Sequence, residues 1–178
     1  MEKSDFLYQS CYCEENIWHL LNELQGSDSR VLFFINREQS VLLMNQEPFG
    51  GAGVGCWDYH VALLDFQRQV IFDFDSRLGF GVQARTYLEQ TVPDPDRVVP
   101  AFQTTIRVID GPDYLGSFSS DRSHMLDGQG RFLAEPPPWD PIQQLVRPLN
   151  LVDLKTAGLE DERIRDYDVV SFLQTFLR

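Results

Sequence analysis

The stretch 56–75 constrains the fold of this chain more than any other part of the sequence. It contains two apolar runs separated by polar residues at 67–68, which is the pattern of a β-hairpin. His60 opens the first run, and Asp73 and Asp75 close the second. A two-residue turn at 67–68 predicts that His60 faces Asp75, whereas a register shifted by two residues places it opposite Asp73.

Either register places a histidine and a carboxylate on one face of the sheet, within about 5–8 Å of each other. A register shifted by one residue would separate them, because it turns one strand over. A histidine held by a carboxylate on rigid strands supplies two of the three groups of a nucleophilic triad. The sequence therefore directs the search for a nucleophile to the rest of the chain.

A helix is predicted directly after Cys11, with Gly26 as its stop signal. Its apolar stripe consists of Ile17, Leu20, Leu21 and Leu24. Cys13 lies one turn before this stripe, at the helix N-terminus, where exposed N–H groups lower the pKa of a thiol. Cys13 is therefore the candidate nucleophile, and Cys11 is less well placed. In the alternative interpretation both cysteines are small core residues.

Apolar segments at 31–36 and 41–44 flank a polar turn and predict a second hairpin. Further elements are predicted as helices at 85–90 and 168–176, a strand at 104–109 and an extended proline-rich strap at 135–141. The 178 residues are enough for one domain with a substantial core. We therefore expect a single catalytic domain over residues 1–178.

The net charge of −12 argues against nucleic acid and anionic membrane as partners and mildly favours cationic ligands. Three cysteines are too few for a disulfide framework, which fits a reducing compartment. The N-terminus lacks the apolar core of a signal peptide, and no apolar run reaches membrane-spanning length. These observations predict a cytoplasmic protein.

Zinc is a competing explanation for the cysteines, with Cys11, Cys13, Cys56 and His60 as the ligands. The Cys-x-Cys spacing is tighter than the two to four intervening residues that structural zinc sites prefer. The sequence has no second Cys-x-x-Cys pair that would complete such a site. We therefore predict no metal.

Five motifs occur in a specific order: S-C-Y-C-E-E-N-I-W (10–18), W-D-Y-H-V (57–61), F-D-F-D (72–75), D-Y-L-G-S-F-S-S-D-R-S-H-M (113–125) and E-P-P-P (135–138). With them the chain resembles, from Tyr8 to Ile142, the protein N-terminal glutamine amidohydrolase family. The resemblance implies an α+β fold, a papain- and transglutaminase-like α-β-α sandwich with a mainly antiparallel sheet. It also implies a monomeric, cofactor-free enzyme with the nucleophile at a helix N-terminus and the histidine and aspartate on adjacent strands.

Carried over by motif, the resemblance implies a triad of Cys13, His60 and Asp73, so it selects between the two aspartates. The expected reaction is hydrolysis of the side-chain amide of an N-terminal glutamine in a protein or peptide to glutamate and ammonia. In eukaryotic members of the family the product enters an N-degron pathway. The chain departs from the family pattern at L-G-F-G (78–81) and at R-D-Y-D-V-V-S-F-L (165–173), which bears on substrate fit more than on the reaction.

Restriction to an N-terminal residue requires a group that holds a free α-ammonium, and a carboxylate is the simplest choice. Asp75 ranks first because it shares a face with Asp73. The other candidate substrate-binding residues are Asp58, Glu14, Asp121, His124 and Tyr12. Two rival functions remain: a papain-like deamidase of internal glutamine or thiol protease, and a non-catalytic module that binds N-termini.

Overall fold

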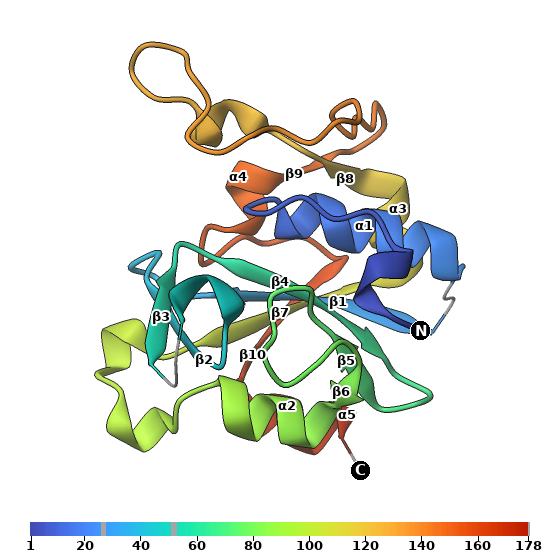
Figure 1. Ribbon diagram of the computed structural model, residues 1–178. Coiled ribbons are helices and arrows are strands. Elements are labelled where there is room, and N and C mark those ends of the chain that lie inside the picture. Colours follow the sequence, from blue (N-terminus) through green and yellow to red (C-terminus); the bar gives the residue numbers. More distant parts are fainter. Residues whose placement is uncertain (26–27, 51–52, 178) are drawn as a thin grey trace.

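The computed structural model describes residues 1–25, 28–50 and 53–177. The fold is α+β, with helices on both faces of a mainly antiparallel sheet (Figure 1). The strand order of this sheet is β10-β7-β1-β4-β5-β6, and all neighbours are antiparallel. Its strands are β1 (Ser29–Ile35), β4 (His60–Asp65), β5 (Val70–Phe72), β6 (Val82–Gln83), β7 (Thr105–Asp110) and β10 (Ile164–Asp168).

The remaining elements cover this sheet or extend it. Two small sheets pair β2 (Val41–Met44) with β3 (Val54–Trp57), and β8 (Phe118–Ser119) with β9 (Leu149–Asn150). The α-helices are α1 (Cys13–Leu24), α2 (Ala84–Thr91), α3 (Gly111–Ser117), α4 (Leu151–Leu154) and α5 (Val169–Phe176). Short 3-10 helices are η1 (Lys3–Asp5), η2 (Glu47–Phe49), η3 (Pro95–Arg97), η4 (Pro100–Phe102) and η5 (Arg122–Met125).

The central strands β1 and β4 divide the core into two layers, because successive side chains point to opposite faces. On one face, odd-numbered residues such as Phe33 and Leu63 pack against α1 and α3. On the other face, even-numbered residues such as Phe34 and Leu64 pack against α2 and α5. Each fully buried side chain of this kind stabilises the fold by about 1.5–3 kcal/mol. The sheet is therefore a rigid platform between two helical layers.

The predicted hairpin register is confirmed, since β4 and β5 pair Leu63 with Phe72 and Asp65 with Val70. The prediction that the second strand continues to Asp75 is wrong, because β5 ends at Phe72. Asp73 instead accepts a hydrogen bond from the backbone N–H of Asp75, and this local bond competes with strand pairing. Both aspartates therefore lie on the turn that follows the strand.

The predicted hairpin of 31–36 with 41–44 does not form. β1 pairs with β4 and β7, whereas β2 pairs with β3. Almost every β1 side chain is buried, and a strand that is apolar on both faces is stable only in the middle of a covered sheet. In β2 buried and half-buried residues alternate, which suits a peripheral strand.

The predicted helix is present as α1 and begins at Cys13. Its C-cap is Gln25, which has a left-handed φ of 48°, and the predicted stop at Gly26 lies outside the described residues. The predicted helices near 85–90 and 168–176 are present as α2 and α5. In the part of the chain that the structure describes, no helix could span a bilayer.

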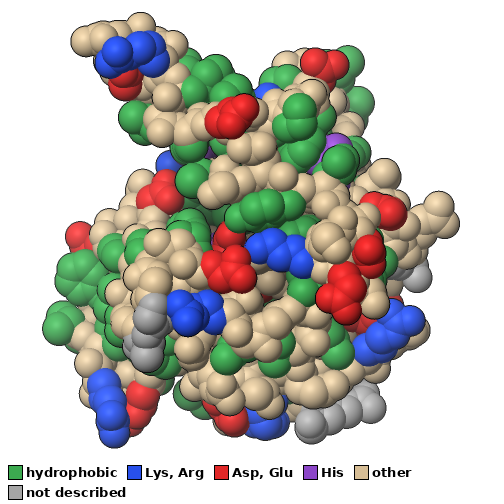
Figure 2. Space-filling model, viewed as in Figure 1, with side chains coloured by type: hydrophobic (Ala, Val, Ile, Leu, Met, Phe, Trp, Pro, Cys, Tyr) green, Lys and Arg blue, Asp and Glu red, His purple; other side chains and the backbone are tan. Residues whose placement is uncertain are grey.

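Arg107 joins the C-terminal segment to the sheet. It is fully buried and forms a bidentate ion pair with Asp166 of β10, with both N–O distances at 2.8 Å. Its Nη1 also donates to the backbone carbonyls of Leu154 and Thr156, at 2.6 and 3.0 Å. These carbonyls flank Lys155, so the buried arginine holds the backbone on both sides of that lysine. The first part of the segment between η5 and β9, around the bridge between Leu126 and Phe132, by contrast, projects as a loop from the body of the molecule (Figures 1 and 2).

Candidate active site

A cleft of about 200 Å³ opens at the N-terminus of α1. Its walls come from the residues before and at the helix start, from the loop between β3 and β4, from the turn after β5, and from η5. The lining residues are Cys11, Cys13, Trp57, Asp58, Tyr59, Asp75, His124 and Met125. The cleft thus gathers segments that are far apart in the sequence, including most of the quoted motifs.

Cys13 is the first residue of α1 and lies in the wall of the cleft with little exposed surface. The prediction of a lowered thiol pKa is wrong. Burial raises the pKa of Cys13 well above its ordinary value, and the nearby carboxylates of Glu14 and Asp75 raise it further. The backbone amide of Val61 opposes this effect only in part. The helix start places the thiol, but it does not by itself make a thiolate.

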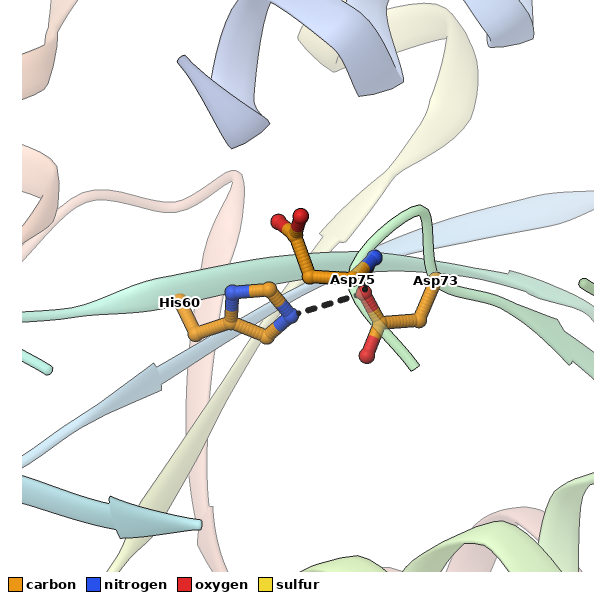
Figure 3. A group of neighbouring side chains, drawn as sticks. All are labelled: His60, Asp73 and Asp75. Atoms are coloured by element: carbon orange, nitrogen blue, oxygen red, sulfur yellow. Dashed lines mark hydrogen bonds and ion pairs between the residues drawn. The ribbon is translucent and has the colours of Figure 1, made fainter. Parts of the chain in front are cut away.

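His60 begins β4 and is completely buried behind the cleft. Its Nε2 lies 2.9 Å from Oδ1 of Asp73 (Figure 3). Burial alone lowers the pKa of His60, but the charge of Asp73 and its hydrogen bond outweigh burial, so that pKa is raised. The Nδ1 atom is buried and has no hydrogen-bond partner among the described residues. One ring nitrogen is thus oriented by a carboxylate, and the other is free for chemistry.

Asp73 is buried, yet its carboxylate is surrounded by donors. Oδ1 accepts from His60 and from the backbone N–H of Asp75, and Oδ2 accepts from the Tyr87 hydroxyl at 2.7 Å and the Gln46 amide at 3.1 Å. Burial raises the pKa of Asp73, but His60 and these hydrogen bonds bring it below its ordinary value. The pair is therefore an ionised carboxylate beside a histidine that readily accepts a proton.

Asp75 lies on the same turn, and its carboxylate points away from that of Asp73 (Figure 3). It lines the cleft, and its Oδ1 accepts a hydrogen bond of 2.7 Å from the Tyr8 hydroxyl. Burial and the neighbouring charge of Asp73 raise the pKa of Asp75. A cationic ligand in the cleft would lower the pKa of Asp75 and so oppose both effects.

Possible ligand atoms of His60, Asp73 and Asp75 all lie within 4.8 Å of one another, so this group has the spacing of a metal site. The hydrogen bonds already made by Asp73 and by Nε2 of His60 favour an acid–base pair over a set of free ligands. The four residues of the zinc hypothesis are not brought together. Among the described residues the close group contains no cysteine, and Cys56 is exposed on β3.

Glu14 is completely buried next to the thiol, so it is not a surface carboxylate at the mouth of the cleft. Its Oε2 accepts a hydrogen bond of 2.8 Å from the Tyr59 hydroxyl and lies 3.6 Å from Sγ of Cys13. Burial raises the pKa of Glu14 to about 7. Its predicted role as a binding site for the substrate α-ammonium does not fit this sealed position.

The other predicted binding residues occupy different positions. Asp58 lines the cleft but pairs with Nζ of Lys155 at 3.2 Å, while Asp121 caps η5 by accepting from the backbone N–H of Ser123. Asp121 is not among the described residues that line the cleft. His124 lines it, and its Nδ1–H donates to the backbone carbonyl of Asp121 at 2.6 Å. Tyr12 is fully buried beside the cleft.

A buried ion pair connects the nucleophile helix to the loop that carries His124. Glu15 of α1 accepts two hydrogen bonds from Arg122 of η5, at 2.8 and 2.6 Å, and a third from the indole N–H of Trp139 at 2.8 Å. Trp139 belongs to the proline-rich strap, so this hydrogen bond attaches the strap to the helix that carries Cys13. The sequence alone did not indicate this connection.

Several residues of the site were missed by the sequence-based interpretation: Tyr8, Gln46, Trp57, Tyr59, Tyr87, Met125 and Lys155. Trp57 and Tyr59 belong to the same W-D-Y-H-V motif as His60, so their proximity was readable. Tyr87 and Lys155 carry no signal in the sequence, since only the fold brings α2 and α4 to this region.

Comparisons with known proteins give one consistent family. A family model described as N-terminal glutamine amidase matches residues 8–175. The protein N-terminal glutamine amidohydrolase of Homo sapiens is 36% identical over 156 residues, which cover 83% of this chain and 76% of the relative. The protein of the same name from Bos taurus is 35% identical over 179 residues, covering 96% and 86%. That from Caenorhabditis briggsae is 34% identical over 174 residues, covering 90% and 94%.

Proposed function

The chain belongs to the N-terminal glutamine amidase family, and we propose that it hydrolyses the side-chain amide of an N-terminal glutamine with Cys13, His60 and Asp73 as its triad. Family membership supplies the reaction, which converts glutamine to glutamate and releases ammonia. The single observation that most supports the assignment of residues is the buried His60–Asp73 pair, with Nδ1 of the imidazole unpaired behind the cleft that Cys13 lines.

In the acylation step the Cys13 thiolate attacks the carbon of the side-chain amide. The C–N bond breaks, and the nitrogen leaves as ammonia with a proton from Nδ1 of His60, which leaves a thioester. In the second step His60 takes a proton from water as that water attacks the thioester, and glutamate and the free thiol are released. Asp73 keeps the imidazole oriented and stabilises its charged form throughout.

The negative charge that develops on the amide oxygen requires hydrogen-bond donors. The first backbone N–H groups of a helix have no partner within the helix. Cys13 is the first residue of α1, so its own N–H is available next to the thiol. We propose that this group contributes to the oxyanion hole.

We assign recognition of the α-ammonium to Asp75. It lines the cleft, the Tyr8 hydroxyl orients it, and no basic side chain pairs with it among the described residues. Asp58 also lines the cleft, but Lys155 already neutralises it. A bound ammonium would favour the ionised form of Asp75, which burial disfavours in the free enzyme.

The arrangement also supports the finer fold assignment. A nucleophile at the start of a helix, packed against a strand that begins with the histidine, is the geometry of papain-like and transglutaminase-like sandwiches. We propose that the whole chain, 1–178, acts as one catalytic domain. We further propose that it works as a cytoplasmic monomer without a cofactor, on proteins or peptides with an N-terminal glutamine.

Ammonia release from a matched pair of peptides tests the function. One peptide begins with glutamine, its partner with N-acetylglutamine, and the Cys13→Ala variant is the blank. Release from the free-amine peptide alone is the expected result. Release from both peptides would favour the internal deamidase, and release from neither by the folded protein would favour a non-catalytic module that binds N-termini.

A further inference from the structure

Glu14 is a buried acid next to the reacting sulfur that the mechanism above does not use. Its side chain is completely inaccessible to solvent, and Oε2 lies 3.6 Å from Sγ of Cys13. The Tyr59 hydroxyl donates to the same Oε2, while Oε1 is buried without a hydrogen-bond partner among the described residues. Asp73, another buried acid of the site, accepts four such bonds.

Hydrogen bonds from the Glu14 backbone N–H, the Tyr59 hydroxyl and the Cys13 thiol lower the pKa of Glu14, but burial outweighs them. The titratable and charged groups around it are Tyr12 before α1, Cys13 and Glu15 on α1, Tyr59 before β4, His60 on β4, Tyr114 on α3 and Arg122 on η5. Glu15 already neutralises Arg122, and His60 is paired with Asp73. Among the described residues no basic side chain pairs with Glu14, and burial of such a carboxylate is costly, so the carboxyl retains its proton up to about pH 7. The pKa of Glu14 is correspondingly raised to about 7.

The position of that proton follows from the geometry. On Oε1 it would have no acceptor, because that atom has no partner among the described residues. On Oε2 it faces Sγ of Cys13, which as a thiolate is a good acceptor. Oε2 can still accept from the Tyr59 hydroxyl while its own proton points to the sulfur.

We propose that Glu14 serves the reaction as a neutral carboxylic acid whose Oε2–H donates a hydrogen bond to the Cys13 thiolate. The proposal rests on the proposed function, because there Cys13 is the nucleophile. No proton is transferred, since the proton stays on Glu14 while the thiol proton goes to His60. An ionised Glu14 would instead place a second negative charge next to the sulfur and oppose thiolate formation.

The proposal predicts the consequences of three substitutions. Glu14→Gln keeps a neutral side chain whose two amide hydrogens can serve both Sγ and the Tyr59 oxygen. Glu14→Leu keeps the volume but removes the donor. Glu23→Gln is the matched control, because it makes the same chemical change on the exposed side of the same helix.

The readout is the rate at which iodoacetamide alkylates Cys13, followed by mass spectrometry that separates Cys13 from Cys11. At pH 6 we expect Glu14→Gln to react within about twofold of the wild type, and at pH 8.5 about threefold or more faster, because the wild-type carboxyl ionises between these values. Glu14→Leu should react about tenfold slower at pH 6. Glu23→Gln should match the wild type at both values.

Two results would overturn the proposal. One is a tenfold or greater loss of reactivity in Glu14→Gln at both pH values, which would show that a carboxylate is required. The other is a ratio of variant to wild type that does not change with pH. If Glu14→Leu does not fold, as judged by circular dichroism, the pH dependence of Glu14→Gln decides alone. Alkylation needs no substrate, so failure of the amidase assay would leave this test intact.

Discussion

Asp73 and Glu14 are both buried carboxyl groups beside a reacting side chain, but their surroundings differ in the number of hydrogen-bond donors. Asp73 accepts from His60, Tyr87, Gln46 and a backbone N–H, and its pKa is lowered. Glu14 accepts from the Tyr59 hydroxyl and has one unpaired oxygen among the described residues, and its pKa is raised to about 7. Equal burial thus accompanies pKa shifts in opposite directions.

The number of hydrogen-bond donors, and not the extent of burial, therefore decides in which direction the pKa of a buried carboxyl group shifts. The donors around Asp73 stabilise its negative charge, and this charge orients the imidazolium of His60. Glu14, in contrast, keeps a proton next to Sγ of Cys13, which becomes negative in the proposed reaction. Below about pH 7 one site can therefore hold two carboxyl groups in two protonation states.

The largest effect is expected on the nucleophile side. Cys13→Ala should lower ammonia release from a glutamine-initiated peptide by about 10⁴-fold or more, because no other group forms the thioester. Thermal unfolding should change little, since the substitution removes one sulfur atom from a tight site. Turnover that persists in this folded variant would contradict the assignment of the nucleophile.

On the base side, Asp73→Asn should lower kcat by about 10³–10⁴-fold, because a neutral amide neither orients the imidazole nor stabilises its charged form. The measurement is steady-state kinetics on the same peptide. Unchanged kcat in the Asp73→Asn enzyme would assign the orienting role to Asp75 and would contradict the proposed contrast between Asp73 and Glu14.

In the wall of the cleft, Asp75→Asn should raise KM for the free-amine peptide by about 10–100-fold, which corresponds to the loss of about 1.4–2.8 kcal/mol of binding. The effect on kcat should be smaller, because Asp75 binds the α-ammonium and does not contact the reacting carbon. A larger increase in KM for Asp58→Asn than for Asp75→Asn would reverse the ranking of the two carboxylates.

The protonation state of Glu14 should also be visible in the pH dependence of stability. A carboxyl group whose folded pKa is raised stabilises the folded state below its unfolded value of 4.5, and this contribution is lost as the pH rises through about 7. Glutamine does not ionise, so replacing Glu14 by Gln removes this pH-dependent loss of stability. The free energy of unfolding of Glu14→Gln, relative to the wild type, should therefore increase by about 2 kcal/mol between pH 5 and pH 8.

Urea unfolding at the two pH values measures this difference. Asp73 should behave in the opposite sense, because its folded pKa is lowered. Its contribution is present above its unfolded value and is lost as the pH falls through the folded pKa. A Glu14→Gln variant with the same relative stability at pH 5 and pH 8 would remove the contrast between the two acids.

The smallest effect is expected at Cys56, which is exposed on β3 and is not among the described residues that line the cleft. Cys56→Ser should leave kcat/KM within about twofold of the wild type, as is usual for an exposed side chain without partners in the site. Activity that depended on Cys56 and was lost with a chelator would revive the zinc hypothesis.

The sequence by itself determined the local elements and the chemical inventory of the site. The apolar stripe predicted α1 and placed Cys13 at its start, because helical periodicity is a local property. The polar turn at 67–68 predicted the register of β4 and β5. The family motifs then predicted His60 and Asp73 as partners, and in the structure Nε2 of His60 lies 2.9 Å from Oδ1 of Asp73.

Only the tertiary structure decided which strands pair over long distances and how each acid is charged. The hairpin predicted from 31–36 and 41–44 failed because burial on both faces draws β1 to the centre of the sheet. The lowered thiol pKa failed because burial and nearby carboxylates outweigh the helix start. Asp58 gained a partner from Lys155, which is far away in the sequence. Charge states depend on the desolvation and the donors that distant segments supply, and no local pattern encodes either.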